Sequence, residues 1–196
     1  MKQAIRQRII AARQQISEAE QMRLSHAIAA RITDLDAWHT AGTVLVYMNF
    51  GAEFAAEKLV TQALQADKRV LLPRINRASR HLDLYQVQDM QHDLAPGTWG
   101  IREPLPERCV RVDALDTIDF ILLPGVAFGR DGARLGYGGG FYDKLLARLT
   151  HKPVLAAGAY GMQLIENIPQ ESTDRKVEWL ATENETIHCA AAGGAK

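Results

Sequence analysis

The chain has 196 residues, with 23 lysines and arginines, 23 aspartates and glutamates, and 47% hydrophobic residues. This length and composition are typical of one globular domain. A formal net charge of zero provides no overall field for binding nucleic acid or an anionic membrane. The longest apolar stretch, residues 120–128, is much shorter than the roughly 20 residues that span a bilayer. These values therefore argue against a protein that binds nucleic acid or spans a membrane. We further expect a cytoplasmic monomer.

The N-terminal segment, residues 1–16, contains four basic residues and no acidic residue. At helical spacing, one apolar face is formed by Ile5, Ile9, Ala12 and Ile16. Beside it, Lys2, Arg6 and Arg13 form a basic stripe, which by itself is typical of a solvated flank. A transit peptide or an RNA-binding segment is an alternative, and deletion of residues 1–7 would distinguish these from a part of the active site.

The next elements alternate between helix and strand. Ser17 and Glu20 have capping-box spacing, which predicts a helix that runs to about Leu35. Residues 43–48 are predicted to form a buried strand, residues 59–64 belong to a helix, and residues 69–72 form a short strand that ends before Pro73. This alternation is typical of a parallel sheet with crossover helices.

The C-terminal half continues the pattern. The period-two run at 82–87 predicts an exposed or edge strand, residues 95–108 a long loop, and residues 118–123 a central strand. A helix is expected over 141–149, a strand over 154–160 and a last strand over 177–181. We predict a single three-layer α/β/α domain over residues 1–189, Rossmann-like with a mostly parallel central sheet, and a disordered tail over 190–196.

Seven of the 15 glycines lie between residues 125 and 140, directly after the predicted central strand. Unobstructed backbone amides that lead into a helix N-terminus suit a phosphate group. Neither GxxxxGK[ST] nor GxGxxG is present, and a tight connection between elements is the alternative. Arg134 before the loop and Asp143 in the following helix favour a nucleotide with magnesium, because they can neutralise phosphates and bind the metal.

The segment Asp131-Gly-Ala-Arg-Leu-Gly-Tyr-Gly-Gly-Gly-Phe-Tyr-Asp143 closely resembles the signature of the 5-formyltetrahydrofolate cyclo-ligase family, also called 5,10-methenyltetrahydrofolate synthetases. Three shorter motifs are similar to other family landmarks: Lys2-Gln-Ala-Ile-Arg6, Leu72-Pro73-Arg74 and Trp99-Gly-Ile-Arg-Glu-Pro104. Together they cover the chain from Lys2 to about Glu183. The glycine signature is specific, whereas the shorter motifs mean little alone.

The resemblance implies an ATP- and magnesium-dependent ligase of one-carbon metabolism. Such an enzyme converts 5-formyltetrahydrofolate to 5,10-methenyltetrahydrofolate and releases ADP and phosphate. The γ-phosphoryl group is transferred to the formyl oxygen, and N10 then attacks the activated carbon as phosphate leaves. Alignment and charge neutralisation are the main tasks of such an enzyme.

The resemblance also implies roles for individual residues. Arg134 is the implied catalytic residue, and the implied ATP-binding residues are Lys2, Arg6, Arg134, Leu135, Gly136, Tyr137, Gly138, Gly139, Gly140, Phe141 and Tyr142. The implied substrate-binding residues are Met48, Glu53, Trp99, Tyr137 and Phe141, although core packing is the alternative for Met48. The implied magnesium ligands are Asp143 and Glu178.

The chain departs from the family pattern at several positions. Tyr137 and Gly139 stand where some relatives carry basic residues, so phosphate neutralisation would depend more on Lys2, Arg6 and Arg134. Glu178 stands where an aspartate is usual, and simple solvent exposure is an alternative for it. A non-catalytic nucleotide-binding regulatory module and another ATP-dependent enzyme that activates amides remain alternatives, which folate-dependent phosphate release would distinguish.

Overall fold

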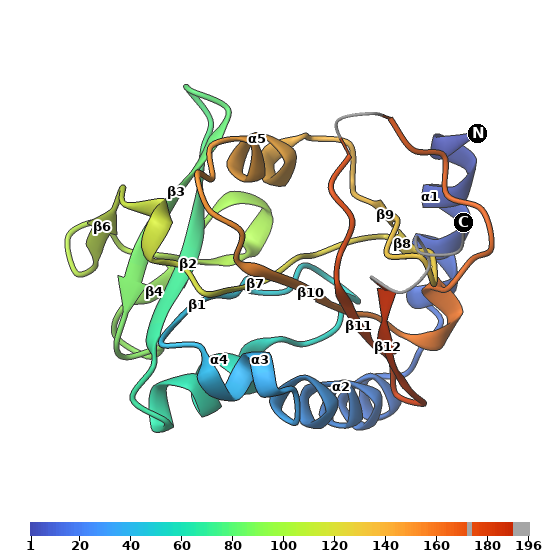
Figure 1. Cartoon of the computed structure of the whole chain (residues 1–196), viewed down its shortest axis with the longest axis horizontal. Coiled ribbons are helices and arrows are strands. Elements are labelled where there is room, and N and C mark those ends of the chain that lie inside the picture. The colour runs from blue at the N-terminus through green and yellow to red at the C-terminus, as the bar shows by residue number, and fades with distance from the viewer. Residues whose placement is uncertain (172–173, 190–196) are drawn as a thin grey trace.

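The computed structural model describes residues 1–171 and 174–189. In this part of the chain, an eight-stranded sheet has the order β12-β11-β10-β7-β1-β2-β3-β6 (Figure 1). Its strands are β1 (Thr43–Leu45), β2 (Arg69–Asn76), β3 (His81–Val87), β6 (Val110–Val112), β7 (Phe120–Leu122), β10 (Val154–Gly158), β11 (Trp179–Ala181) and β12 (Thr186–His188). The strands β2, β1, β7, β10 and β11 run parallel to one another. The pairs β2–β3, β3–β6 and β11–β12 at the two sides of the sheet are antiparallel. The predicted mostly parallel sheet is confirmed.

Helices cover both faces of this sheet, as predicted. Figure 1 shows α2, α3 and α4 on one face, α5 on the other, and α1 at one end beside β8 and β9. The helices are α1 (Lys2–Arg13), α2 (Glu18–Thr33), α3 (Asp36–Thr40), α4 (Glu57–Gln65) and α5 (Phe141–Ala147). The Ser17 side chain accepts a hydrogen bond from the Glu20 amide, which confirms the predicted start of α2. Helices α4 and α5 are the crossovers of the β1–β2 and β7–β10 parallel pairs.

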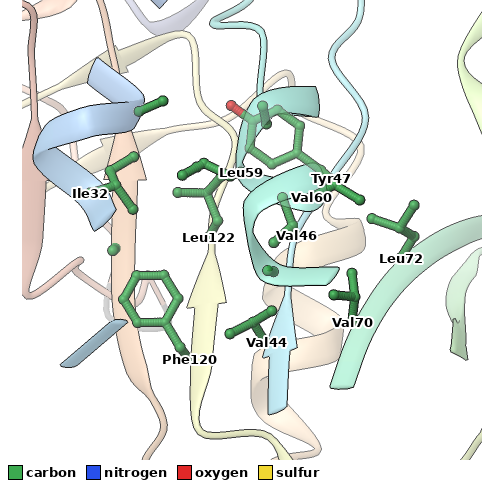
Figure 2. Packing of buried hydrophobic residues seen from close by; sticks show 14 of the residues in the cluster. Ile32, Val44, Val46, Tyr47, Leu59, Val60, Val70, Leu72, Phe120 and Leu122 are labelled. Atoms are coloured by element: carbon green, nitrogen blue, oxygen red, sulfur yellow. The ribbon is translucent and has the colours of Figure 1, made fainter. Parts of the chain in front are cut away.

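The side chains of β7 alternate between two hydrophobic cores. Phe120 and Leu122 face a cluster that includes Ile32 of α2 and Leu59 of α4 (Figure 2). Ile121 and the following Leu123 belong to a second cluster, which includes Leu145 and Leu146 of α5. Both clusters are almost free of solvent, because β7 lies between β1 and β10 in the sheet. The prediction of a central strand here is confirmed.

Two strand predictions were wrong for reasons that the sheet explains. β2 continues through Pro73 to Asn76, because β1 pairs only with residues 69–71 and leaves one side of β2 without a ladder at the proline. β3 is not an edge strand, because β6 pairs with Leu84, Tyr85 and Gln86. Its predicted alternation is present, with every second side chain buried over much of the strand.

Other boundaries also differ from the predictions. The expected loop at 95–108 contains a small hairpin of β4 (Leu94–Pro96) and β5 (Arg102–Pro104), with a 3-10 turn η1 (Thr98–Gly100) between them. β11 is not the last strand, because β12 returns antiparallel to it. The structure also has the short turns η2 (Leu115–Thr117) and η3 (Gly161–Gln163) and the hairpin of β8 (Ala127–Phe128) and β9 (Arg134–Leu135).

The predicted tail at 190–196 lies outside the described residues. Among the helices that the structure describes, none combines the length and apolar character needed to cross a membrane. Cys109 and Cys189 are both buried free thiols.

Candidate functional site

The glycine loop, residues 136–140, connects β9 to α5 and lies against α1. Gly138 has a φ of 98°, and a Cβ atom there would lie 3.4 Å from the guanidinium carbon of Arg6. Gly140 has a φ of 69° and caps the N-terminus of α5. Arg6 Nε donates a 2.8 Å hydrogen bond to the Gly136 carbonyl. Helix α1 therefore brings Arg6 to the loop, although the two segments are distant in sequence.

Arg134 lies beneath the start of the loop, and its side chain is only 5% exposed. One guanidinium nitrogen donates to Asp143 Oδ1 at 2.6 Å, and another donates to the Pro124 carbonyl at 3.2 Å. The buried Nε has no hydrogen-bond partner in the described residues. Asp143 is 44% exposed, and that hydrogen bond occupies one of its two carboxylate oxygens. The structure thus brings together the predicted catalytic residue and a predicted metal ligand.

Lys2 lies near a different group of residues. Its Nζ atom is 2.8 Å from a Glu171 carboxylate oxygen and 3.6 Å from an oxygen of Asp174. The carboxylate of Glu171 raises the pKa of the Lys2 ammonium group. Lys2 and Arg6 share a helix, but Lys2 contacts these two acidic residues rather than the glycine loop.

Glu53 is buried at 5% exposure in the segment that follows β1. Its Oε2 accepts a 2.7 Å hydrogen bond from the Phe50 amide, while its carbonyl accepts hydrogen bonds from Gln21 and from the Tyr160 hydroxyl. Burial raises the pKa of the Glu53 carboxyl group, whereas hydrogen bonding from Tyr137 and Phe50 and the positive charge of Arg13 oppose that rise. The carboxylate is therefore held in one place inside the protein.

Sequence reasoning missed the role of Arg13 in this region. Arg13 is 3% exposed, and its Nη2 donates a 2.6 Å hydrogen bond to the Tyr137 hydroxyl on the glycine loop. It was interpreted as part of a solvated basic stripe with Lys2 and Arg6. Helical spacing places Arg13 on the same face as Arg6, but spacing alone does not show that this part of the helix is buried against the glycine loop.

The remaining predicted residues lie around this centre at different depths. Met48 is buried in the first hydrophobic cluster at 8% exposure, and Leu135 is buried in a third. The Phe141 ring packs closely against Gly139, where an added Cβ would lie 2.8 Å from a ring carbon. Burial raises the pKa of the Tyr142 hydroxyl well above its usual value, and the nearby charge of Glu53 adds to the rise.

Trp99 lies apart from the glycine loop on η1, with 62% of its surface exposed and a φ of 56°. The neighbouring Gly97 and Thr98 line a cavity of about 490 Å³ near the end of β2, whose lining also includes Arg74 and Arg77. Because β2 runs parallel to β1, this cavity lies toward the same edge of the sheet as Met48 and Glu53.

Glu178 is not brought beside Asp143. It lies at the entry of β11, where its amide donates a hydrogen bond to the Leu155 carbonyl and its own carbonyl accepts one from the Cys189 amide. Its side-chain Oε1 accepts a 3.4 Å hydrogen bond from the Leu155 amide. Leu155 lies near the start of β10 and pairs with Ile121 of β7. Arg134 instead donates a hydrogen bond to the carbonyl of Pro124, which follows the C-terminal end of β7, and Asp143 accepts a hydrogen bond from Arg134. In the described residues, no group of three or more histidine, cysteine, aspartate or glutamate side chains forms a metal site.

The arrangement has the properties of an anion-binding site that lies near a buried carboxylate. Three arginines, Arg6, Arg13 and Arg134, surround a loop that presents bare backbone amides. A helix N-terminus follows directly, so its partial positive charge adds to theirs. The buried carboxylate of Glu53 supplies an acceptor for N–H groups near Tyr137. Such a site can hold a polyphosphate next to a nitrogen-rich ring.

Comparison with known proteins gives a consistent match. A family model described as the 5-formyltetrahydrofolate cyclo-ligase family matches residues 1–183. The chain is 34% identical to the Escherichia coli 5-formyltetrahydrofolate cyclo-ligase over 172 residues, which is 87% of this chain and 91% of that protein. It is 29% identical to the Mus musculus 5-formyltetrahydrofolate cyclo-ligase over 177 residues, with 86% and 87% of the two chains covered.

Solved structures agree with the sequence matches. The Aquifex aeolicus 5,10-methenyltetrahydrofolate synthetase superposes with a TM-score of 0.84 at 30% identity, covering 100% of this chain and 96% of the other. A Mycoplasma pneumoniae 5,10-methenyltetrahydrofolate synthetase has a TM-score of 0.74 at 20% identity and shares the fold, with 93% and 98% of the two chains covered.

Proposed function

The chain belongs to the 5-formyltetrahydrofolate cyclo-ligase family, and from this premise we propose that it uses Mg-ATP to close 5-formyltetrahydrofolate to 5,10-methenyltetrahydrofolate. The chain is a ligase enzyme that acts on a small folate substrate. The observation that supports an ATP-dependent reaction is the position of the glycine loop between Arg6 and the Arg134–Asp143 pair. We also propose that the enzyme acts as a cytoplasmic monomer.

The chemistry explains why such a loop is needed. An amide-like formyl oxygen is a poor leaving group, so transfer of the γ-phosphoryl group to it activates the formyl carbon and releases ADP. N10 of the folate then attacks that carbon, and phosphate leaves with the oxygen. The protein has to align two substrates and neutralise the charge on the transferred group. Backbone amides of residues 136–140, Arg6 and Arg134 are suited to that neutralisation.

Magnesium fits the acidic residue that lies beside the loop. Mg²⁺ is usually held by one or two carboxylates together with substrate phosphates and waters, and it would neutralise phosphate charge during transfer. Asp143 has one carboxylate oxygen bonded to Arg134 and is 44% exposed, so its second oxygen can bind the metal. We propose Asp143 as the protein ligand. The position of Glu178 at the entry of β11 does not support a metal-binding role for it.

On the substrate side, Glu53 is the proposed acceptor for the amino and ring N–H groups of the pterin. Tyr137 and Phe141 are proposed to contact the folate from the glycine loop, and Met48 to pack below it. Trp99 directly follows Gly97 and Thr98, which line the cavity near β2, and is the proposed contact for a more distant part of the substrate. Tyr142 and Leu135 are proposed to shape the ATP site through the backbone of the loop, together with Lys2 from helix α1.

The test is the near-ultraviolet absorbance of the methenyl product after the protein is mixed with 5-formyltetrahydrofolate and Mg-ATP. We expect the band to grow only when ATP is present, with one phosphate released for each product formed. Arg134→Ala should lower kcat by about 10²–10³-fold, because a preorganised donor to the transferred group is lost. The matched control is Arg130→Ala, which removes an exposed arginine that pairs with Glu185.

Two results would contradict the proposal. A folded protein that binds ATP but releases no folate-dependent phosphate would be a nucleotide-binding regulatory module. Phosphate release with another amide, and none with the formylfolate, would identify a different activating enzyme.

The metal assignment has its own test. Asp143→Asn keeps an oxygen for the Arg134 hydrogen bond but loses the charge, so we expect it to raise the Mg²⁺ concentration needed for half-maximal rate by about tenfold or more. Glu178→Gln is the control and should leave that concentration unchanged. An equal shift in both variants would overturn the assignment of Asp143 as the metal ligand.

A further inference from the structure

Arg13 is an unusual buried cation. It is 3% exposed, and it forms no ion pair with any carboxylate in the described residues. Its Nε atom is buried without a hydrogen-bond partner. Burying a guanidinium that contacts no carboxylate directly is costly unless another charge nearby offsets it. The fold alone gives no reason for a charged group at this position.

Among the described residues, the Arg13 side chain makes one hydrogen bond, which joins it to the glycine loop. Nη2 donates to the Tyr137 hydroxyl at 2.6 Å, and this contact links the end of α1 to the middle of the loop. Because the hydroxyl oxygen accepts from Arg13, its own proton is free to be donated elsewhere. The buried carboxylate of Glu53 is the acceptor that we assign to this proton, and its negative charge raises the pKa of the Tyr137 hydroxyl.

Among the described residues, Arg13 is the cation whose charge acts on Glu53. Five titratable groups from different parts of the chain interact electrostatically with the Glu53 carboxylate. They are Arg13, Tyr47, Tyr137, Tyr142 and Tyr160. All of these except Arg13 are phenols, and burial raises the pKa of each hydroxyl above its usual value. Arg13 is therefore the group that can offset a negative charge on Glu53.

We propose that Arg13 is a positioning residue of the folate site: it holds the Tyr137 hydroxyl against the Glu53 carboxylate and supplies the positive charge that this buried carboxylate needs. Helix α1 thereby contributes a cation near a loop whose positions 137 and 139 carry no charge. This inference rests on the proposed function, because it assumes that an ionised Glu53 accepts hydrogen bonds from the pterin. It assigns Arg13 to the folate rather than to the nucleotide.

The experiment compares Arg13→Met with Arg8→Met, an exposed arginine on the same helix. We expect Arg13→Met to raise KM for 5-formyltetrahydrofolate about tenfold or more at neutral pH, the loss typical of one hydrogen bond to a charged group, and to change KM for ATP less than twofold. Loss of the Arg13 charge raises the pKa of Glu53 further, so the rising limb of kcat/KM for the folate should move to higher pH. Arg8→Met should have neither effect.

Two more variants keep the proposal testable if Arg13→Met folds poorly. Tyr137→Phe removes the bridging hydroxyl from a residue that is 40% exposed, and it should reproduce the rise in KM for the folate. Arg13→Lys retains the charge and should move the pH profile less than Arg13→Met does. The double variant Arg13→Met/Tyr137→Phe should be no worse than Arg13→Met alone, because Arg13→Met already breaks the link to the Tyr137 hydroxyl.

The outcomes separate this inference from the proposed function. If the unaltered protein forms no methenyl product, the proposed function itself fails. If it forms product but Arg13→Met and Tyr137→Phe match Arg8→Met, the positioning role is overturned. An equal rise in KM for ATP and for the folate would also overturn it, because Arg13 would then act on the phosphates or on the loop as a whole.

Discussion

At the scale of single residues, the site contains ionisable side chains that are buried, and burial disfavours their charged forms. Glu53 is the main example, because burial raises the pKa of its carboxyl group despite the Tyr137, Phe50 and Arg13 contacts. Arg13 and Arg134 are both buried, and each has an Nε atom without a partner in the described part of the chain. Such residues lower stability and are retained where a ligand uses them.

Glu53→Gln should stabilise the protein while removing activity. The folded protein binds the Glu53 proton more tightly than the unfolded chain does, so this group makes the protein less stable as pH rises above the unfolded pKa of 4.5. We expect a higher Tm for Glu53→Gln than for the unaltered protein at pH 7.5, with the difference vanishing near pH 4. Thermal unfolding followed by circular dichroism at both pH values measures this. A lower Tm at pH 7.5 would contradict the assigned burial of the charge.

At the scale of elements, α1 contributes more to the site than any other helix apart from α5. Arg6 bonds to the loop backbone and Arg13 to a loop side chain, while Lys2 lies against Glu171 and Asp174. Ile9 anchors the helix in the third hydrophobic cluster, which also contains Leu135 at the start of the loop. The helix and the loop therefore share one packing unit, and disturbing either should affect the other.

The pairing of Lys2 with Glu171 predicts competition with ATP. If Lys2 binds phosphates, it has to release the Glu171 carboxylate, which is 71% exposed. Glu171→Gln should therefore lower KM for ATP by up to about fivefold, the upper range for a surface ion pair. Lys2→Met should raise it, and deletion of residues 1–7 should raise it further because Arg6 is lost as well. Steady-state kinetics at low salt measure these changes, and an unchanged KM for ATP in Lys2→Met would remove Lys2 from the nucleotide site.

At the scale of the whole molecule, the residues that stabilise the sheet and the residues of the site lie in different parts of the fold. The fully buried Phe120 and Leu122 lie in the middle of the sheet, with the Trp38 ring edge-on to Phe120 at 5.3 Å between centroids. The polar groups of the site instead lie beyond the strand ends, in the segments that follow β1, β7 and β10. This is the usual position of ligands in open α/β sheets.

Phe120→Ala should therefore weaken the fold without altering the reaction. Removing a fully buried ring costs about 3–5 kcal/mol of unfolding free energy, from a typical total of about 5–15 kcal/mol. We expect the urea midpoint to fall by a large fraction, while KM for both substrates stays unchanged at temperatures where the protein is folded. Val110→Ala, at an exposed position in β6, is the control and should leave the midpoint nearly unchanged. A change in KM without a change in stability would contradict this separation.

The sequence by itself determined the features that depend on local pattern and chemical type. Hydrophobic runs and capping signals predicted the central strand at 118–123, the start of α2 and the alternation of helices with parallel strands. Helical spacing placed Lys2, Arg6 and Arg13 on one stripe, and the glycine signature identified the family. These predictions succeeded because strand burial, helix caps and a bare-amide loop are each encoded within a few neighbouring residues.

Only the tertiary structure decided which distant residues meet. Pro73 is tolerated inside β2 because β1 is short, and β3 is covered because β6 returns to it. Glu178 lies near the start of β10 rather than beside Asp143. The burial of Arg13 and its contact with Tyr137, 124 residues away, follow from how α1 packs on the glycine loop. Periodicity assigns a residue to a face of its own helix, whereas the partner of that face depends on long-range packing.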